Sequence, residues 1–231
     1  MQSVVSNVYS IDGLRTANVF VITDDAGLTL IDTGMPGEAD KIITQLEAAG
    51  YGVADIQRIL VTHTHSDHVG SLADLVQRSG AQVMAHQAEV AYIEQTQSLV
   101  YTAFWRRFVG WLVDRLSKSA PCAVDVALQD GDVVDVLGGL RVIHTPGHTP
   151  GSIVLYQSAQ QVLFCGDVIF NGGPFGGGGG ITLPPTFFSV DAVQAAASVS
   201  RIAELPVETM CFGHGAPIVS RAGEQLRAVL G

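Results

Sequence analysis

Three histidines and one aspartate occur within the six residues His63-Thr-His-Ser-Asp-His68. His63 and His65 are two positions apart, so their side chains project to the same side of an extended backbone and can converge on one metal ion. The side chains of Asp67 and His68 are expected to point toward a second metal ion. A single histidine of this kind would be an ordinary surface residue, but four ligand-type residues in six positions predict a metal site.

Three further side chains of the same kind occur later in the chain. His148, Asp167 and His214 each follow a predicted strand and each have a glycine neighbour, which lets the backbone pass close to a bound ligand. The two other histidines are His86 and His144. A Pro-Gly pair interrupts any helix that could pair His144 with His148, so we expect structural or ligand-supporting roles for both.

Together these motifs resemble the metallo-β-lactamase-fold superfamily. The His-x-His-x-Asp-His motif of residues 63–68, Pro-Gly-His of 146–148, Gly-Asp of 166–167 and Gly-His of 213–214 occur in the order typical of that family. The likeness runs from about Asn18 to Ile218 and includes Ile31-Asp-Thr-Gly34, which resembles the family's turn beneath the metals. It implies an α/β fold, a four-layer αββα metallo-β-lactamase sandwich, as a single domain over residues 1–231.

The resemblance assigns the candidate ligands to two adjoining metal sites. They are His63, His65 and His148 for the first site, Asp67, His68 and His214 for the second, and Asp167 as the bridge between them. The resemblance also implies that Asp67 is catalytic, because it orients the nucleophile. Asp32 resembles the buried carboxylate that orients a ligand histidine.

Two divalent metal ions are the cofactors that this ligand set implies. The three imidazoles of the first site suit zinc, whereas the two carboxylates of the second leave iron or manganese there as open alternatives. Such paired ions hold a water whose pKa falls toward about 7. The reaction implied is hydrolysis of a thioester, lactone or related ester or amide by a metal-bridging hydroxide. A serine nucleophile is not expected, because Gly-x-Ser-x-Gly is absent.

Other activities occur on this fold and remain alternatives. They are β-lactamase activity, iron-dependent persulfide dioxygenase or redox chemistry, and metal binding without catalysis. Glyoxalase II and the dioxygenases usually have an arginine after the Gly-Asp motif, but Ile169–Leu183 contains no basic residue. Lactonases commonly have a tyrosine there, where this chain has Phe187 and Phe188. We expect these two rings to contact the substrate.

The elements that must position these residues alternate between short β-rich runs and amphipathic helices, which predicts α/β layers. Strands are expected at Val4–Tyr9, Val19–Ile22, Leu28–Ile31, Ile59–Val61, Gln82–Ala85, Val133–Val136, Leu140–Ile143, Ile153–Tyr156, Val162–Cys165 and Thr209–Phe212. Helices are expected at about 38–49 and 69–80, at Asp191–Leu205 with Ser189 as its cap, and at Ala222–Leu230 with Ser220 as its cap. The histidine cluster itself is expected on a loop.

Two segments have open interpretations. The aromatic run Leu99–Leu116 predicts a helical insertion near 95–118, which either packs on the core or covers a pocket or a homodimer contact. The glycine-rich run Gly172–Gly180 is either a flexible loop beside the substrate cleft or a plain connector. It lacks the spacing of a nucleotide-binding loop.

The amino-acid composition limits the binding partners and the cellular location that we expect. The chain has 231 residues, of which 47% are hydrophobic and 15% charged, and a net charge of −10. This acidic balance, without a Lys/Arg run, argues against nucleic acid and favours a small-molecule substrate. No apolar run is long enough for a membrane span. The N-terminus lacks signal-peptide features, and the three cysteines show no paired spacing, so we expect free thiols in a cytoplasmic protein.

Overall fold

The computed structural model describes residues 1–99, 119–173 and 179–231. The side chain of Phe187 lies outside this described set. The predicted helical insertion falls mainly on residues 100–118, and the centre of the glycine-rich run on 174–178, so both predictions also lie outside the described residues.

The N-terminal half forms a mixed sheet that, within the described residues, has seven strands in the order β1-β2-β3-β4-β5-β6-β7. Its strands are β1 (Gln2–Val5), β2 (Val8–Ser10), β3 (Phe20–Asp24), β4 (Gly27–Ile31), β5 (Ile56–Val61), β6 (Gln82–His86) and β7 (Val126–Leu128). Pairing is antiparallel from β1 to β4 and parallel from β4 to β7. The carboxyl ends of β4, β5 and β6 therefore meet at one edge, where ligand sites of such sheets usually lie.

The prediction of one strand over Val4–Tyr9 was wrong, because the chain reverses there. Asn7 has φ 64° and connects β1 to β2 in a hairpin. Asparagine tolerates this left-handed conformation better than most residues do. The other predicted strands are present with ends shifted by up to three residues.

The C-terminal half forms a second sheet, with five strands in the order β14-β11-β10-β9-β8 among the described residues. Its strands are β8 (Val133–Val134), β9 (Leu140–His144), β10 (Ile153–Gln157), β11 (Val162–Gly166) and β14 (Thr209–Phe212). The pair β11 and β14 is parallel, and the other pairs are antiparallel. A small hairpin of β12 (Phe170–Asn171) and β13 (Ile181–Thr182) lies between β11 and the last two helices in sequence.

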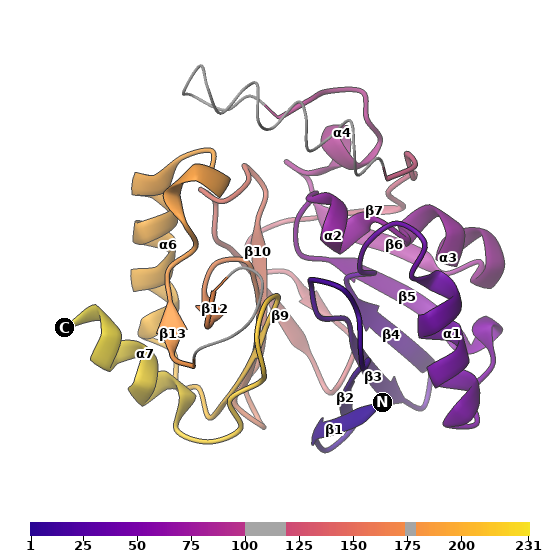
Figure 1. Cartoon of the computed structure of the whole chain (residues 1–231), viewed down its shortest axis with the longest axis horizontal. Coiled ribbons are helices and arrows are strands. Elements are labelled where there is room, and N and C mark those ends of the chain that lie inside the picture. The colour runs from indigo at the N-terminus through magenta and orange to yellow at the C-terminus, as the bar shows by residue number, and fades with distance from the viewer. Residues whose placement is uncertain (100–118, 174–178) are drawn as a thin grey trace.

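Helices cover the outer face of each sheet, as Figure 1 shows. The helices are α1 (Ala39–Ala48) and α3 (Leu72–Ser79) on the first sheet, α6 (Ala192–Ala203) and α7 (Ala222–Leu230) on the second, and the short α2 (Ser66–Val69), α4 (Val90–Ile93), η1 (Val53–Asp55) and η2 (Thr186–Phe188). No helix in the described residues is long and apolar enough to cross a membrane.

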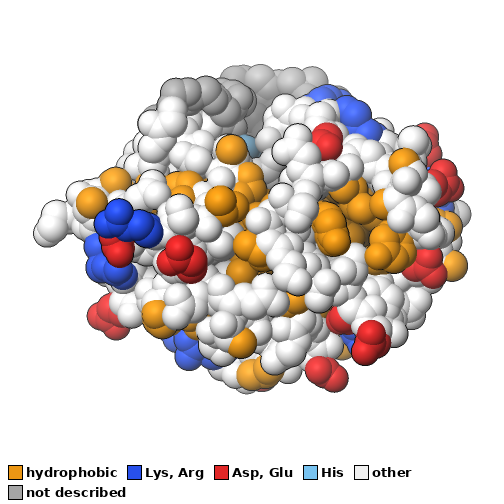
Figure 2. Space-filling model, turned by 90° about the horizontal axis from the view of Figure 1, so that it is seen from below, with side chains coloured by type: hydrophobic (Ala, Val, Ile, Leu, Met, Phe, Trp, Pro, Cys, Tyr) orange, Lys and Arg blue, Asp and Glu red, His pale blue; other side chains and the backbone are white. Residues whose placement is uncertain are grey.

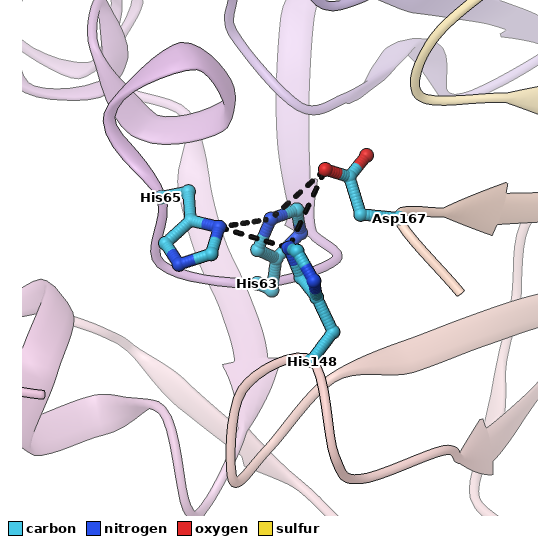
Figure 3. A group of neighbouring side chains, drawn as sticks. All are labelled: His63, His65, His148 and Asp167. Atoms are coloured by element: carbon cyan, nitrogen blue, oxygen red, sulfur yellow. Dashed lines mark hydrogen bonds and ion pairs between the residues drawn. The ribbon is translucent and has the colours of Figure 1, made fainter. Parts of the chain in front are cut away.

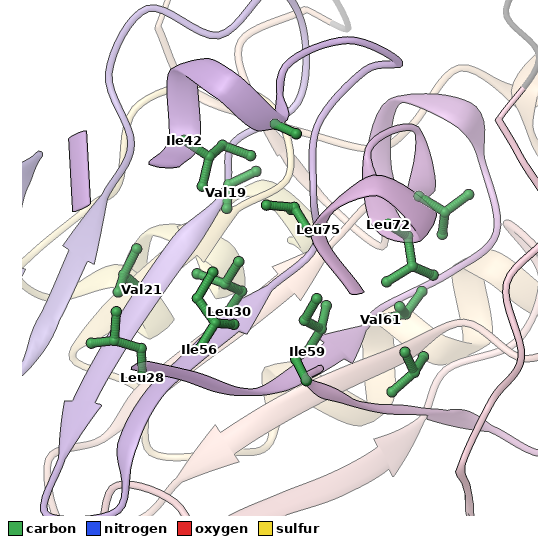
Figure 4. Packing of buried hydrophobic residues seen from close by; sticks show 14 of the residues in the cluster. Val19, Val21, Leu28, Leu30, Ile42, Ile56, Ile59, Val61, Leu72 and Leu75 are labelled. Carbon is green, nitrogen blue, oxygen red and sulfur yellow. The ribbon is translucent and has the colours of Figure 1, made fainter. Parts of the chain in front are cut away.

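Three apolar layers hold these elements together. In the first sheet Leu28 and Leu30 pack toward Ile42 of α1 and Leu75 of α3 (Figure 4), while Ile31 faces the second sheet. A third layer joins the second sheet to α6 and α7. Alternate residues of one strand thus serve opposite layers, and this arrangement confirms the four-layer αββα sandwich.

Both predicted helix caps were wrong. Asp191, rather than Ser189, accepts the backbone N–H groups of Val193 and Gln194 at 3.0 Å each. The helix begins at Ala192, so only Asp191 is near enough to accept those donors. At α7 the residue before the helix is Arg221, with φ 54° and no side-chain cap, and its N–H donates to Glu208.

Charged side chains are scattered on the face shown in Figure 2. Lysine and arginine side chains lie there in small groups, partly beside acidic ones, and apolar side chains occupy much of the centre. Among the residues that the structure describes, this face presents no continuous basic surface of the kind that binds a phosphate backbone.

Candidate metal centre

The first sheet contributes the residues that follow β4 and β5. Asp32 comes directly after β4, and its N–H donates to Leu60 of β5. Thr62 and His63 follow β5 at the same edge. The prediction of a loop for the whole cluster was wrong in part, because Asp67 and His68 lie in α2, which begins directly after His65.

The second sheet brings the other candidate ligands to the same place. His148 lies in the connection from β9 to β10, Asp167 follows β11, and His214 follows the parallel neighbour β14. Hydrogen bonds from Ile153 and Asn18 join the two halves of the chain beside these residues. The N–H of Ile153 donates to the Thr62 carbonyl at 3.1 Å, and the Asn18 amide donates to the carbonyls on both sides of the His214 loop.

The first group consists of His63, His65, His148 and Asp167, whose ligand atoms all lie within 4.8 Å of one another. Nδ1 of His65 is 3.2 Å from Nε2 of His63 and 2.9 Å from Nε2 of His148 (Figure 3). Nitrogens bound to one tetrahedral zinc ion are separated by about 3.3 Å. A proton on Nδ1 of His65 could form a hydrogen bond with only one of the two neighbouring Nε2 atoms. Three ring nitrogens that converge in this way therefore fit a shared metal cation.

The second group consists of Asp67, His68 and His214, and Asp167 lies against it as well. Nε2 of His214 is 3.3 Å from a carboxylate oxygen of Asp67 and 3.3 Å from one of Asp167. Nε2 of His68 is 3.2 Å from the other oxygen of Asp167. Asp167 therefore lies against histidines of both groups, and its role as a bridging ligand stays a prediction.

Asp32 fixes the orientation of one histidine in each group. Its carboxylate accepts the Thr62 N–H at 2.8 Å, the Thr62 hydroxyl at 2.7 Å and Nδ1–H of His68 at 2.7 Å. Because the Thr62 hydroxyl donates to Asp32, its oxygen accepts Nδ1–H of His63 at 3.1 Å. Both histidines thus direct Nε2 to the ligand cluster. The sequence motif had indicated Asp32 but not Thr62, although Thr62 directly precedes His63.

The two groups differ in how strongly they hold protons. Burial lowers the pKa of His63 well below its usual range and, with the nearby His148, that of His65 to about 3. In the second group Asp167 and Asp67 outweigh burial and raise the pKa of His214 to about 9. His63 and His65 therefore present neutral imidazoles, whereas an ion entering the second group must displace the proton of His214.

The remaining predicted residues lie outside both groups. The rings of His86 and His144 stack with centroids 4.0 Å apart. Nδ1 of His86 accepts the Ala88 N–H, and Nε2 of His144 lies 2.9 Å from the Pro150 carbonyl. Phe188 belongs to η2, two residues before Val190, whose N–H donates to the His148 carbonyl. Its contact with substrate stays a prediction.

An αββα sandwich with two adjoining clusters of histidine and aspartate at one edge defines an α/β metal-binding domain. The model of the metallo-beta-lactamase superfamily matches residues 12–214, and the chain belongs to this superfamily. The chain is 28% identical to the probable metallo-hydrolase YflN of Bacillus subtilis (strain 168), across 90% of this chain and 84% of that protein.

A second relative has a named activity. The chain is 32% identical to a hydroxyacylglutathione hydrolase of Ectopseudomonas mendocina (strain ymp), across 77% of this chain and 53% of that enzyme, so the match spans about half of its length. Among solved structures, a metallo-beta-lactamase family protein of Thermus thermophilus has a TM-score of 0.78 at 22% identity, covering 98% of this chain and 79% of that one. This likeness shows the fold.

Proposed function

We propose that this chain is a dinuclear metal-dependent hydrolase that cleaves a thioester, a lactone or a related ester. The observation that carries the proposal is the position of Asp167. Its carboxylate lies 3.4 Å from the His148 ring of the first group and 3.3 Å from the His214 ring of the second. One buried carboxylate that touches both clusters favours a pair of ions over two unrelated single sites.

The donor atoms of each group indicate which ion it would hold. His63, His65 and His148 offer three imidazole nitrogens and suit zinc, whereas the group with Asp67 and Asp167 also suits iron or manganese. When bound, such ions supply an activated water and polarise the carbonyl of the substrate.

Asp67 is the side chain that we assign to the reacting water. Its side chain is 23% exposed, against 5% for His214 and 6% for Asp167, so it faces the solvent side of the cluster. Burial raises the pKa of Asp67, but His68 and His214 outweigh burial and hold this pKa at about 2. At neutral pH its carboxylate is therefore ionised and can accept a hydrogen bond from the attacking water.

The relative with a named activity supports a thioester as the first substrate to test, because it is a hydroxyacylglutathione hydrolase at 32% identity. The match covers about half of that enzyme, so glutathione recognition is not carried over. We also propose a cytoplasmic location. Cys165 and Cys211 are unpaired and fully buried, as is usual where thiols stay reduced.

Metal analysis combined with a substrate panel tests this function. Protein loaded with zinc, and separately with iron or manganese, is assayed on a hydroxyacyl thioester, an acyl lactone and a chromogenic cephalosporin. We expect two ions per chain and hydrolysis of the thioester or the lactone. In His148→Ala we expect loss of metal binding and of hydrolysis. Turnover of the cephalosporin alone would reassign the chain as a β-lactamase, and iron binding without any hydrolysis would refute the proposal.

A further inference from the structure

Glu89 is a buried acid behind the metal centre that the reaction itself does not use. It is the residue before α4, and its relative exposure is 0%. Among the described ion pairs none includes Glu89. Acidic side chains are seldom buried so completely without a cationic partner, so its hydrogen bonds must explain its place.

Those hydrogen bonds come from the segment that directly follows His148 of the first ligand group. Oε1 of Glu89 accepts the Thr149 hydroxyl at 2.7 Å and the Gly151 N–H at 2.6 Å. Among the described hydrogen bonds these two are the ones that the carboxyl group accepts, and its Oε2 accepts none. Thr149 directly follows His148, and Glu89 itself follows β6, which pairs with β5 ahead of His63 and His65. One carboxyl group thus ties the segment of His148 to the first sheet.

The segment after His148 fits closely around this carboxyl group. Ser152 Oγ accepts the Thr149 N–H at 3.0 Å and lies 2.8 Å from the Thr149 hydroxyl. A Cβ atom added at Gly151 would come within 2.7 Å of Cγ and 2.8 Å of N of Glu89. No side chain could fit between them, so the position of Gly151 is fixed by direct packing as well as by a hydrogen bond.

The pKa of Glu89 reflects both its burial and the hydrogen bonds that its carboxyl group accepts. Burial raises its pKa to about 7, and the donors at Thr149 and Gly151 act against burial by favouring the charged form. Hydrogen bonds from neutral donors to a charged acceptor are stronger than those between neutral groups. The hydrogen bonds from Thr149 and Gly151 are therefore strongest when Glu89 is ionised.

We propose that Glu89 is a positioning residue that sets the separation between His148 and the pair His63 and His65, and so the metal affinity of the first group. The inference rests on the metal centre of the proposed function. Without the carboxyl group, the Thr149 hydroxyl and the Gly151 N–H lose their acceptor, and the His148 segment is free to move relative to β5. Removing such a supporting hydrogen bond typically weakens metal binding by about 10–100-fold.

The test compares Glu89→Ala, Glu89→Gln and Gln157→Ala. Gln157 is a matched control, because it is also buried, bonds to Leu137 and Gln160, and lies at the opposite end of β10. Zinc and cobalt affinities of the full chain are measured by competition with a chromophoric chelator. The same titration in an Asp67→Ala background assigns the affinity of the first group, and hydrogen exchange of the peptide 145–152 reports the order of the loop.

In Glu89→Ala we expect zinc affinity of the first group to fall about 10–100-fold, with faster exchange of the 145–152 peptide. Glu89→Gln keeps an oxygen acceptor and should restore most of the affinity. Gln157→Ala should lower the melting temperature without changing the affinity. If Glu89→Ala lowers the melting temperature equally but leaves the affinity of the first group at the wild-type value, the inference is overturned.

Thr149→Val provides a second variant of similar volume, in case Glu89→Ala does not fold. It removes one of the donors and should weaken the first group by a smaller factor, whereas unchanged affinity would overturn the inference. These measurements need no substrate. A wild-type chain that binds two ions but hydrolyses nothing in the panel would refute the hydrolase and leave the role of Glu89 standing.

Discussion

Replacing Asp32 by asparagine should weaken both metal sites without disturbing the fold. Asp32 has φ 61°, a conformation that asparagine tolerates better than most residues do. The new side-chain amide would keep one oxygen for the Thr62 N–H but would turn an NH2 group toward the Thr62 hydroxyl and Nδ1 of His68, where the carboxylate now accepts two protons. The substitution therefore changes hydrogen-bond direction rather than shape.

The reversed hydrogen bonds would propagate to the metal-facing nitrogens. If Nδ1 of His68 accepts from the amide, its proton must sit on Nε2, which faces Asp167. If the Thr62 oxygen accepts from the amide, its own proton turns toward Nδ1 of His63, and Nε2 of His63 also becomes protonated. A protonated nitrogen cannot bind a metal ion, so both groups lose affinity.

The expected loss follows from the hydrogen bonds that are replaced. A hydrogen bond to a charged group contributes about 1.5–3 kcal/mol, and about 1.4 kcal/mol corresponds to a tenfold change in affinity. Zinc affinity of Asp32→Asn should therefore fall about 10–100-fold at each site. Competition titration measures the affinities, and nitrogen NMR of the imidazoles reports which ring nitrogen carries the proton.

Asp55→Asn is the control for this experiment. Asp55 is an exposed aspartate of η1, and its carboxylate accepts only the Gly52 N–H among the described hydrogen bonds. Its replacement should leave both affinities unchanged. If folded Asp32→Asn binds two zinc ions with wild-type affinity, or if His63 and His68 keep their proton on Nδ1, the hydrogen-bond reasoning is refuted.

Three further predictions concern the catalytic carboxylate and the titrating histidines. Asp67→Ala should keep the fold and the ion of the first group but lose at least about 100-fold in hydrolysis, in line with the usual cost of a proton-handling group; near wild-type turnover of a purified sample would exclude its assigned role. Zinc titrated into ion-free protein at pH 7 should release protons from His68 and His214, because neighbouring carboxylates outweigh burial and raise the pKa of His68 well above its usual range and that of His214 to about 9. Calorimetry in buffers of different ionisation enthalpy measures this release, and a heat that does not depend on the buffer contradicts it. Burial, and next the stacked His144, lower the pKa of His86 to about 4 from 6.5, so the unfolded chain binds this proton more tightly and stability should rise with pH between about 4 and 6.5. In His86→Asn that rise should be smaller by about 1–2 kcal/mol in urea unfolding, and an identical pH dependence would contradict the assignment.

The local pattern of the sequence predicts much of the architecture. Strands that contact two apolar layers, such as β4 with Leu30 and Ile31 on opposite faces, form short apolar runs that the residue types alone reveal. The start and end of α7 were also predicted correctly. Errors arose where one residue decides the outcome, as at Asn7, whose positive φ turns one expected strand into a hairpin.

The candidate ligands are visible in the sequence because their types and spacing are local. His63 and His65 are two residues apart, and the glycine beside each of His148, Asp167 and His214 marks a close backbone approach. Family resemblance implies the division into two groups. The groups themselves form only in the folded chain, where the ends of strands from both sheets bring their side chains together.

Apart from Asp32, which family resemblance indicates, only the tertiary structure identifies the residues that hold the ligands in place. Thr62 and Asp32 are 30 positions apart, Glu89 and Thr149 are 60, and Asn18 and Phe212 are 194. Each of these contacts consists of one or two hydrogen bonds between side-chain or main-chain polar groups, and no spacing in the sequence links the two partners. A metal ligand must be a histidine, cysteine or carboxylate and so is recognisable by type, whereas a supporting hydrogen bond can come from almost any polar group that folding brings within about 3 Å.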